Sequence, residues 1–538
     1  MNTSPERRRR LTVHEPISGF VSKSRLAYIA CTLPVRRKEG TNQKGNICLS
    51  GLRSTKRTTR RTTNCTPRRT ARVSAISFFL AAFAGFAGCS DAPAPSPQQT
   101  PNIVLVTIDT LRADRIEPYG NLNAKTPNLS KLAREGTLFE AAMSPMQMTR
   151  PSHYSLFTSL YPRDHGVVNN KISLEPNFLS VAQVLEQRGY ATAGMVAVSL
   201  LGDQSGAARG FADYDAPTGT TVRTSEDVVG RASTWLAQRP KDKPFFLWVH
   251  LFDPHTPYAP PAAFAPAPVA NEFDVLTSID IEDLLALESK HKGNLPRDVV
   301  DRAIALYQGD IEYTDHWLGK FMMALESSAP PAQTVLAVTS DHGECFEKGI
   351  YFEHSDCLYE GAARIPLIFR YPNIVAASER RKDVVEILDV APTLLSLAGI
   401  AVPEVFKGVD LFDESTASDR AAYLQHPFYS NVGAQNRSVR RLKRVMGAPT
   451  RDLLTSEELI GLRTQRWKYL LRASREELYD LNIDPSEKLN VTAQYPEVVK
   501  ELRTTLQAWS EAHPQHHTNA EQINDELRAT LEALGYLH

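Results

Sequence analysis

The chain has little cysteine and no hydrophobic run long enough to form a stable membrane-spanning helix. Its longest apolar stretch, residues 73–88, falls short of the roughly 20 residues that a bilayer requires. Six cysteines occur in 538 residues, and three of them precede residue 72. Cys89 directly follows the apolar stretch, so only Cys345 and Cys357 remain for a folded body. Those two either pair in an oxidising compartment or stay as free thiols.

The body of the chain also lacks the excess of basic residues that nucleic-acid binding requires. The formal net charge is zero, but residues 1–72 hold 18 Lys and Arg against 3 Asp and Glu. The remainder therefore holds 43 basic and 58 acidic residues. An acidic body excludes nucleic acid as a partner, because phosphate backbones bind to basic surfaces. A small anionic ester stays compatible as a substrate, since a bound metal ion inverts the local field.

The apolar stretch is typical of an export signal. Residues 1–72 show no apolar periodicity and cannot bury enough surface to fold, so we expect a basic disordered segment or an extension of the gene model, with translation starting near Val73. Residues 73–89 form the predicted lipoprotein signal peptide, because residues 86–89 resemble a bacterial lipobox that ends in the lipidation site Cys89. The predicted location is the bacterial cell envelope, lipid-anchored or, with a plain secretory signal, periplasmic. Beyond Cys89 we expect a proline-rich linker (90–100), a catalytic domain (101–425) and a carboxyl-terminal subdomain (426–538).

Three apolar runs in the predicted catalytic domain end in residue types that bind metals. Residues 102–108 precede Asp109, residues 334–340 precede Asp341 and His342, and residues 245–252 lie just before His255. Continuous β-branched and apolar runs are typical of central parallel strands that are buried on both faces. Further strands are expected at 191–198 and 365–369, and helices at 127–134, 179–188, 228–238, 298–326 and 384–397.

The alternation of strands and helices predicts an α/β fold with a doubly wound, mostly parallel sheet flanked by helices. Because ligands bind at the carboxyl ends of the strands in such sheets, Asp109, Asp341, His342 and His255 are expected to gather at one edge. The carboxyl-terminal subdomain is predicted to be a small α+β unit. It has short strands at 467–471 and 477–481 and amphipathic helices at 496–511 and 520–534, the last of which packs on the main domain or mediates dimerisation.

Several ordered motifs resemble the sulfatase family of the alkaline-phosphatase superfamily. Residues 102–109 resemble the family's opening strand, and residues 149–153 (Thr-Arg-Pro-Ser-His) resemble its nucleophile signature. Residues 340–344 (Ser-Asp-His-Gly-Glu) are similar to its second metal motif, and residues 463–485 to its carboxyl-terminal subdomain. The resemblance implies an alkaline-phosphatase-like fold and a metal-dependent hydrolase of sulfuric or phosphoric esters.

The chain departs from the family pattern at three positions. Family sulfatases carry a Cys or Ser, which is oxidised to formylglycine, where this chain has Thr149. They carry Arg in place of His153 and often a second Asp in place of Thr110. Because Thr is not converted to that aldehyde by the usual route, we place the chain in a subgroup that uses an unmodified Thr nucleophile.

A free Thr hydroxyl is a poor nucleophile, so coordination to a divalent cation is expected to activate Thr149. Asp109, Asp341 and His342 would supply the other ligands, with Thr149 completing the set. Mixed nitrogen and oxygen ligands favour Zn or Mn, and Ca remains compatible. A formylglycine hydrate expels sulfate through its second hydroxyl, which Thr149 lacks. A phosphoester is therefore the favoured substrate, carried on a glycan or a lipid.

Four further residues are candidates at the site. His255 and His354 are expected to protonate the leaving oxygen or to hold a second metal, with a structural role as the alternative. His153 either orients Thr149 or binds an oxyanion. Asn170 donates to the transferred group in one interpretation and is an ordinary loop residue in the other. Two rival functions remain: a transferase that passes a phosphoryl group to a glycan or lipid alcohol, and a non-catalytic binding protein.

Overall fold

The computed structural model describes residues 100–267, 276–279, 284, 287, 290, 295–346, 354, 357–415, 419–426, 458–472, 475–516 and 525–534. The predicted extension, signal peptide, lipidation site at Cys89 and nearly all of the linker lie outside these residues. Among the described residues, no helix combines the length and the apolar character that crossing a bilayer demands.

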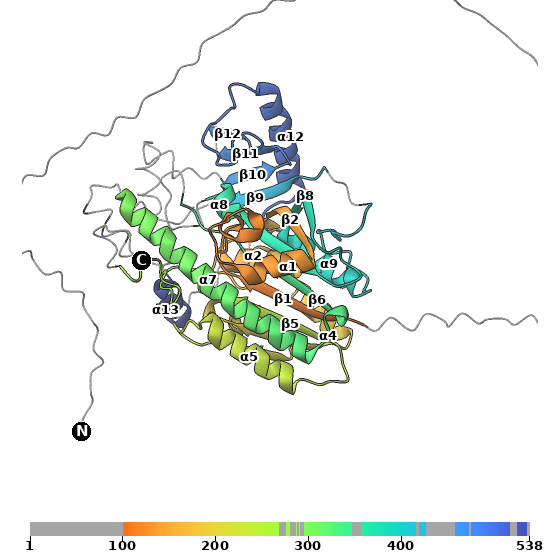
Figure 1. Cartoon of the computed structure of the whole chain (residues 1–538). Helices are drawn as coiled ribbons and strands as arrows, with labels where there is room; N and C mark the ends of the chain where they lie inside the picture. The colour runs from red at the N-terminus through yellow and green to blue at the C-terminus, as the bar shows by residue number, and fades with distance from the viewer. Residues whose placement is uncertain are drawn as a thin grey trace, which may run out of the picture. The chain divides into compact units, whose positions relative to one another are not determined.

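A mixed eight-stranded sheet forms the centre of the described fold (Figure 1). β1 (Asn102–Ile108) lies between β5 (Phe245–Leu251) and β6 (Thr334–Thr339), and the three strands run parallel. They are buried almost throughout, as their continuous apolar sequences predict. The full order is β4–β3–β5–β1–β6–β7–β2–β8, with β4 (Asp213–Asp215), β3 (Ala191–Val196), β7 (Arg364–Arg370), β2 (Thr137–Met143) and β8 (Glu379–Glu386).

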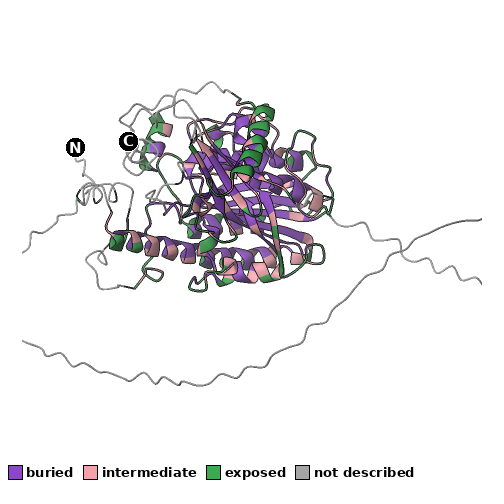
Figure 2. Ribbon diagram, turned by 90° about the horizontal axis from the view of Figure 1, so that it is seen from above, coloured by how far each residue is buried: buried purple, intermediate pink, exposed green. Residues whose placement is uncertain are grey.

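The doubly wound, mostly parallel architecture predicted from the sequence is confirmed. β7 runs antiparallel to both of its neighbours, β6 and β2, whereas the other strand pairs are parallel. One helix group comprises α1 (Pro127–Glu135), α5 (Ser225–Gln238) and α7 (Arg297–Ser328), which pack along one another (Figure 1). A second comprises α2 (Thr149–Thr158), α3 (Pro162–His165), α4 (Val181–Gln187) and α9 (Val390–Leu397). Figure 2 shows buried strands between helices whose outer faces are exposed.

The single helix expected over residues 384–397 is wrong in its first part. Residues up to Glu386 complete β8, a 3-10 turn follows at Ile387–Asp389, and only then does α9 begin. Val384 and Val385 pair with β2, so neighbouring strand contacts override the helical spacing of the apolar residues.

A separate four-stranded antiparallel sheet forms the carboxyl-terminal subdomain, as predicted. Its strands are β9 (Ala422–His426), β10 (Leu459–Arg463), β11 (Trp467–Arg472) and β12 (Arg475–Asp480), and α12 (Pro496–Ala512) packs on β10 and β11. The last helix, α13 (Asp525–Ala533), contacts the 3-10 turn Ser199–Leu201, which places it on the main domain.

A buried carboxyl group joins the two sheets. Glu386, at the end of β8, accepts hydrogen bonds from the Tyr161 hydroxyl at 2.9 Å and from the Tyr423 backbone N–H of β9 at 2.9 Å. Burial, together with the nearby charge of Asp389, raises the pKa of Glu386 to about 8. The folded protein therefore holds a proton on Glu386 that an unfolded chain releases at lower pH.

The Glu386 proton predicts a pH-dependent stability. Because the folded-state pKa lies above the ordinary value, Glu386 lowers the free energy of unfolding as pH rises from about 4.5 to about 8. Glu386→Gln mimics the protonated form, so its Tm should gain on the wild-type Tm between pH 5 and pH 9. Thermal unfolding measures this difference. Glu379→Gln, at the exposed start of the same strand, is the control. A Tm difference between Glu386→Gln and the wild type that stays constant from pH 5 to pH 9 would contradict the raised pKa of Glu386.

Candidate metal-dependent active site

Strand register brings two aspartates together at one edge of the large sheet. Thr107 of β1 lies opposite Thr339 of β6, and the same register continued two residues places Asp109 opposite Asp341. His342 is next in the chain. Ligand atoms of Asp109, Asp341 and His342 all lie within 4.8 Å of one another, and the three side chains are completely buried.

Among the described residues, one polar atom of each of these three side chains has no hydrogen-bond partner. These atoms are Asp109 Oδ1, Asp341 Oδ2 and His342 Nε2, which is 3.3 Å from Asp341 Oδ2. Burial raises the pKa of both carboxyls, and the charge of Asp109 raises that of Asp341 further. Burial also lowers the pKa of His342 well below its ordinary value, which favours the neutral, metal-binding imidazole. Because unpartnered buried carboxylates are costly, this donor set fits a divalent cation.

Close backbone packing holds the segment that follows β6. The Gly343 N–H donates to the Ala362 carbonyl at 2.7 Å, and a Cβ on Gly343 would lie 2.2 Å from the Gly361 carbonyl oxygen. On the β1 side, Thr110 adopts a left-handed backbone with φ 55°, which is costly for a β-branched residue. Its N–H donates to Asp341 Oδ1 at 3.3 Å. Because Thr110 directly follows Asp109, this hydrogen bond connects the chain at Asp109 to the side chain of Asp341.

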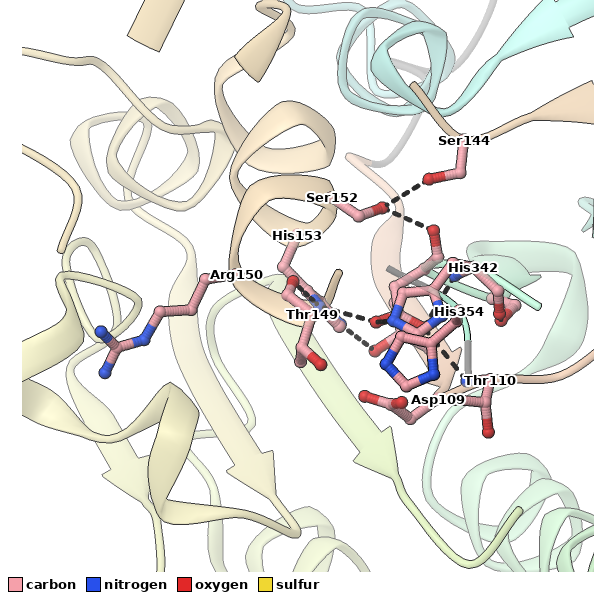
Figure 3. Close-up of polar contacts among 12 residues, drawn as sticks. Asp109, Thr110, Ser144, Thr149, Arg150, Ser152, His153, His342 and His354 are labelled. Carbon is pink, nitrogen blue, oxygen red and sulfur yellow. Dashed lines mark hydrogen bonds and ion pairs between the residues drawn. The ribbon is translucent and has the colours of Figure 1, made fainter. Parts of the chain in front are cut away.

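Helix α2 begins at Thr149 and is buried along its whole length, although most of its residues are polar. The Thr149 side chain interacts with the Asp109 carboxylate, and this interaction opposes the rise that burial causes in the pKa of Asp109. Ser152 donates its hydroxyl to the Asp341 carbonyl at 2.5 Å (Figure 3). Asn170 Oδ1 accepts the Arg150 N–H at 2.9 Å. The first turn of α2 is thus attached to the same strand ends that carry the carboxylates.

His153 turns back over the first turn of α2. Its Nδ1 lies 2.8 Å from the Thr149 carbonyl oxygen and its Nε2 lies 3.1 Å from Thr107 Oγ1 (Figure 3). Burial and the neighbouring His250 hold the pKa of His153 well below its ordinary value. Both ring nitrogens of His153 therefore contact groups of the protein, and one of these groups is the backbone of Thr149.

Two further histidines flank the candidate metal site. His354 stacks on His342 with ring centroids 4.4 Å apart, and its Nδ1 lies 3.4 Å from Glu344 Oε1. His255 packs against His354 with centroids 5.4 Å apart, and its Nδ1 donates to the Thr256 carbonyl at 2.7 Å. Burial opposes the charged form of both imidazoles. At His354 the negative charges of Glu344, Asp109 and Asp341 together outweigh burial and raise the pKa, whereas the pKa of His255 falls to about 4.

A disulfide closes the chain around His354. Cys345 and Cys357 are bonded across 12 residues, and the Cys357 N–H donates to the His354 carbonyl at 3.1 Å. Of the two states left open by the sequence, the structure therefore shows the paired one. Cys345 directly follows Glu344, so the bridge connects both ends of the segment to the candidate metal motif.

Sequence patterns missed three side-chain contacts of the site, which involve His250, Glu344 and Thr107. His250 Nε2 lies 3.4 Å from Asp109 Oδ2, and Glu344 Oε2 accepts the Tyr258 hydroxyl at 3.0 Å. Thr107 contacts His153. Two of these contacts had a signal in the sequence, because His250 and Thr107 interrupt otherwise apolar strands. A polar side chain at a fully buried strand position needs a hydrogen-bond partner. Asn170 is buried, and its Nδ2 has no hydrogen-bond partner within the residues that the structure describes.

An α/β sheet with buried carboxylates and histidines at the carboxyl ends of its strands defines the class of α/β proteins with a candidate metal-binding site at the edge of the sheet. The sulfatase family model matches residues 101–400, and the model for the carboxyl-terminal part of N-sulphoglucosamine sulphohydrolase matches residues 347–512. The chain therefore belongs to the sulfatase family, whose members hydrolyse ester bonds.

Relatives and solved structures agree with this assignment. Arylsulfatase K of Rattus norvegicus is 25% identical over 491 residues, which cover 80% of this chain and 84% of that protein. A protein solved in complex with its substrate D-glucosamine-2-N,6-O-disulfate superposes with a TM-score of 0.60 at 20% identity, covering 77% of this chain and 98% of the other. The phosphonate monoester hydrolase of Agrobacterium radiobacter gives a TM-score of 0.59 at 21% identity, covering 77% and 96%.

Metal binding should stabilise the folded protein, because a cation relieves the repulsion between Asp109 and Asp341. After treatment with EDTA, addition of Zn or Mn should raise Tm, and Asp341→Asn should abolish that rise. Asp253→Asn is the matched control, because Asp253 follows β5 at the same edge but accepts the Ser225 N–H at 2.9 Å. An equal metal-induced rise in Tm for Asp341→Asn and the wild type would show that Asp341 does not bind the metal.

Proposed function

We propose that this member of the sulfatase family cleaves a phosphoric or sulfuric ester by attack of the Thr149 hydroxyl oxygen. The bond between phosphorus or sulfur and the leaving oxygen breaks, an alcohol departs, and water then hydrolyses the ester of Thr149. The observation that carries the proposal is the position of Thr149 at the start of a buried helix, where its side chain interacts with Asp109 beside three ligand atoms that have no hydrogen-bond partner among the described residues.

Asp109, Asp341 and His342 would hold the divalent cation, with Zn or Mn favoured over Ca. When bound, such an ion lowers the pKa of a coordinated hydroxyl and offsets negative charge on the transferred group. The chain's own contribution is to direct Thr149. Ser152 fixes the helix to the Asp341 carbonyl, and Asn170 fixes it through the Arg150 N–H.

Proton delivery to the leaving oxygen falls to His354. Its Nδ1 faces Glu344, so its Nε2 lies on the opposite edge of a ring that is stacked on His342. The free Nδ2 donor of Asn170, which is buried close to Thr149, is suited to an oxygen of the transferred group. His255 supports the His354 ring by packing against it.

A phosphoester is the favoured substrate, because the second step must release the group from Thr149. Thr has a single hydroxyl, so it cannot expel sulfate by the elimination open to a formylglycine hydrate, and hydrolysis of a phosphothreonine is ordinary nucleophilic chemistry. Both chemistries occur among the structural neighbours, one of which has a disulfated glucosamine as its substrate while another is a phosphonate monoester hydrolase. The alcohol is proposed to belong to a glycan or a lipid.

Turnover of nitrophenyl esters tests the proposal. Purified protein should hydrolyse bis(4-nitrophenyl) phosphate faster than 4-nitrophenyl sulfate. Thr149→Ala should lower kcat by about a thousandfold or more while Tm stays close to the wild-type value. Thr149→Ser keeps the hydroxyl and should retain most activity, and Thr158→Ala at the other end of α2 is the control. Undiminished turnover by Thr149→Ala would show that Thr149 is not the nucleophile. Faster hydrolysis of the sulfate ester would contradict the proposed phosphoester substrate.

We propose that a lipid attached to Cys89 anchors the enzyme to a membrane of the bacterial cell envelope. The bond between Cys345 and Cys357 supports export, because disulfides persist in oxidising compartments. Cys89→Ser should shift the protein from the membrane pellet to the soluble fraction of a cell lysate, as followed by immunoblot. An unchanged distribution would contradict the anchor.

A further inference from the structure

A chain of buried hydrogen bonds runs from the middle of the sheet to the proposed nucleophile. Trp248 Nε1 of β5 lies 2.9 Å from Thr107 Oγ1 of β1, and that oxygen lies 3.1 Å from His153 Nε2. The other ring nitrogen, His153 Nδ1, lies 2.8 Å from the Thr149 carbonyl oxygen. All four residues are completely buried.

The two ends of this chain set the direction of every bond in it. An indole N–H only donates and a carbonyl oxygen only accepts. Trp248 therefore donates to Thr107, and His153 Nδ1–H donates to Thr149. The Thr107 hydroxyl proton then points to His153 Nε2, which accepts it as the unprotonated nitrogen of a neutral imidazole.

A charged His153 paired with Asp341 is the competing arrangement, since Nδ1 lies 3.6 Å from Asp341 Oδ2. In that state Nε2 would also donate to Thr107, whose own proton would then need another acceptor. Among the described residues, Trp248 and His153 are the partners of the Thr107 hydroxyl, so that proton would be stranded in a dry interior. The neutral imidazole satisfies every donor and acceptor.

We propose that Thr107 is a positioning residue, which holds His153 in its Nδ1–H tautomer so that His153 pins the backbone of Thr149. This inference rests on the proposed function of Thr149. Thr107 and Trp248 lie on adjacent central strands of the sheet, whereas Thr149 begins a helix that has no side-chain N-cap. The hydrogen-bond chain ties that helix start to the most deeply buried strands.

Removing the Thr107 hydroxyl tests the proposal. Thr107→Val keeps the shape of the side chain but cannot donate to His153, so kcat for bis(4-nitrophenyl) phosphate should fall about tenfold or more with little change in KM, since a small displacement of a reacting group costs rate. Thr107→Ser restores the hydroxyl and should restore kcat. Thr192→Val is the matched control, because Thr192 is a buried strand threonine that accepts one N–H, from Ala212 at 2.9 Å.

Nitrogen-15 NMR of the wild-type holoenzyme tests the tautomer without any dependence on activity. The His153 signals, assigned by difference with His153→Gln, should show a protonated Nδ1 and an unprotonated Nε2. A protonated Nε2, or equal kcat values for Thr107→Val and Thr192→Val, would overturn the positioning role. If Thr149→Ala remained active, the proposed function would fail instead, and the NMR result would still decide the tautomer.

Discussion

Two buried carboxylates that face each other across adjacent parallel strands govern the arrangement of the rest of the site. Asp109 and Asp341 repel each other in the buried interior, and each has an oxygen with no hydrogen-bond partner in the described part of the chain. A folded protein retains such a pair only when positive charge compensates it. The start of α2 lies beside the pair, where the positive end of the helix dipole meets negative charge, and a cation would complete the compensation.

The groups around the carboxylates are held from several directions at once. Thr110 bonds Asp341 from the β1 side, Ser152 bonds the same residue from α2, and His250 contacts Asp109 from β5. The disulfide at Cys345 adds a covalent restraint on the segment that carries His354. These many contacts suit a site in which a weak nucleophile must be held in position before it reacts, because a small displacement of a reacting atom lowers the rate.

The sequence predicted that Asp109, Asp341 and His342 gather at one edge of the sheet, because strand propensity and residue chemistry coincide there. Residues 102–108 and 334–339 are continuous apolar runs that end in Asp109 and Asp341, and parallel strands must bring such ends to one edge. The same reasoning failed at residues 384–386, where Val384 and Val385 fit a helix and a strand equally well and contact with β2 decides. Contacts from elsewhere in the fold also fix the start of α1, where the hydroxyl of the N-cap residue Thr126 makes no hydrogen bond to the helix. That hydroxyl instead accepts the Glu117 N–H, and Asp315 of α7 bonds the first turn of α1.

Local sequence by itself determined the three central strands, most of the helices, the chemical nature of the candidate ligands and the presence of a hydroxyl residue at position 149. Tertiary structure alone decided which polar side chains meet. The contacts between His153 and Thr107, Glu344 and Tyr258, and Asp109 and His250 join residues 46, 86 and 141 positions apart. Such pairs leave no periodic trace in the chain, because they depend on sheet register and on the exclusion of water, which arise only when the whole core has packed.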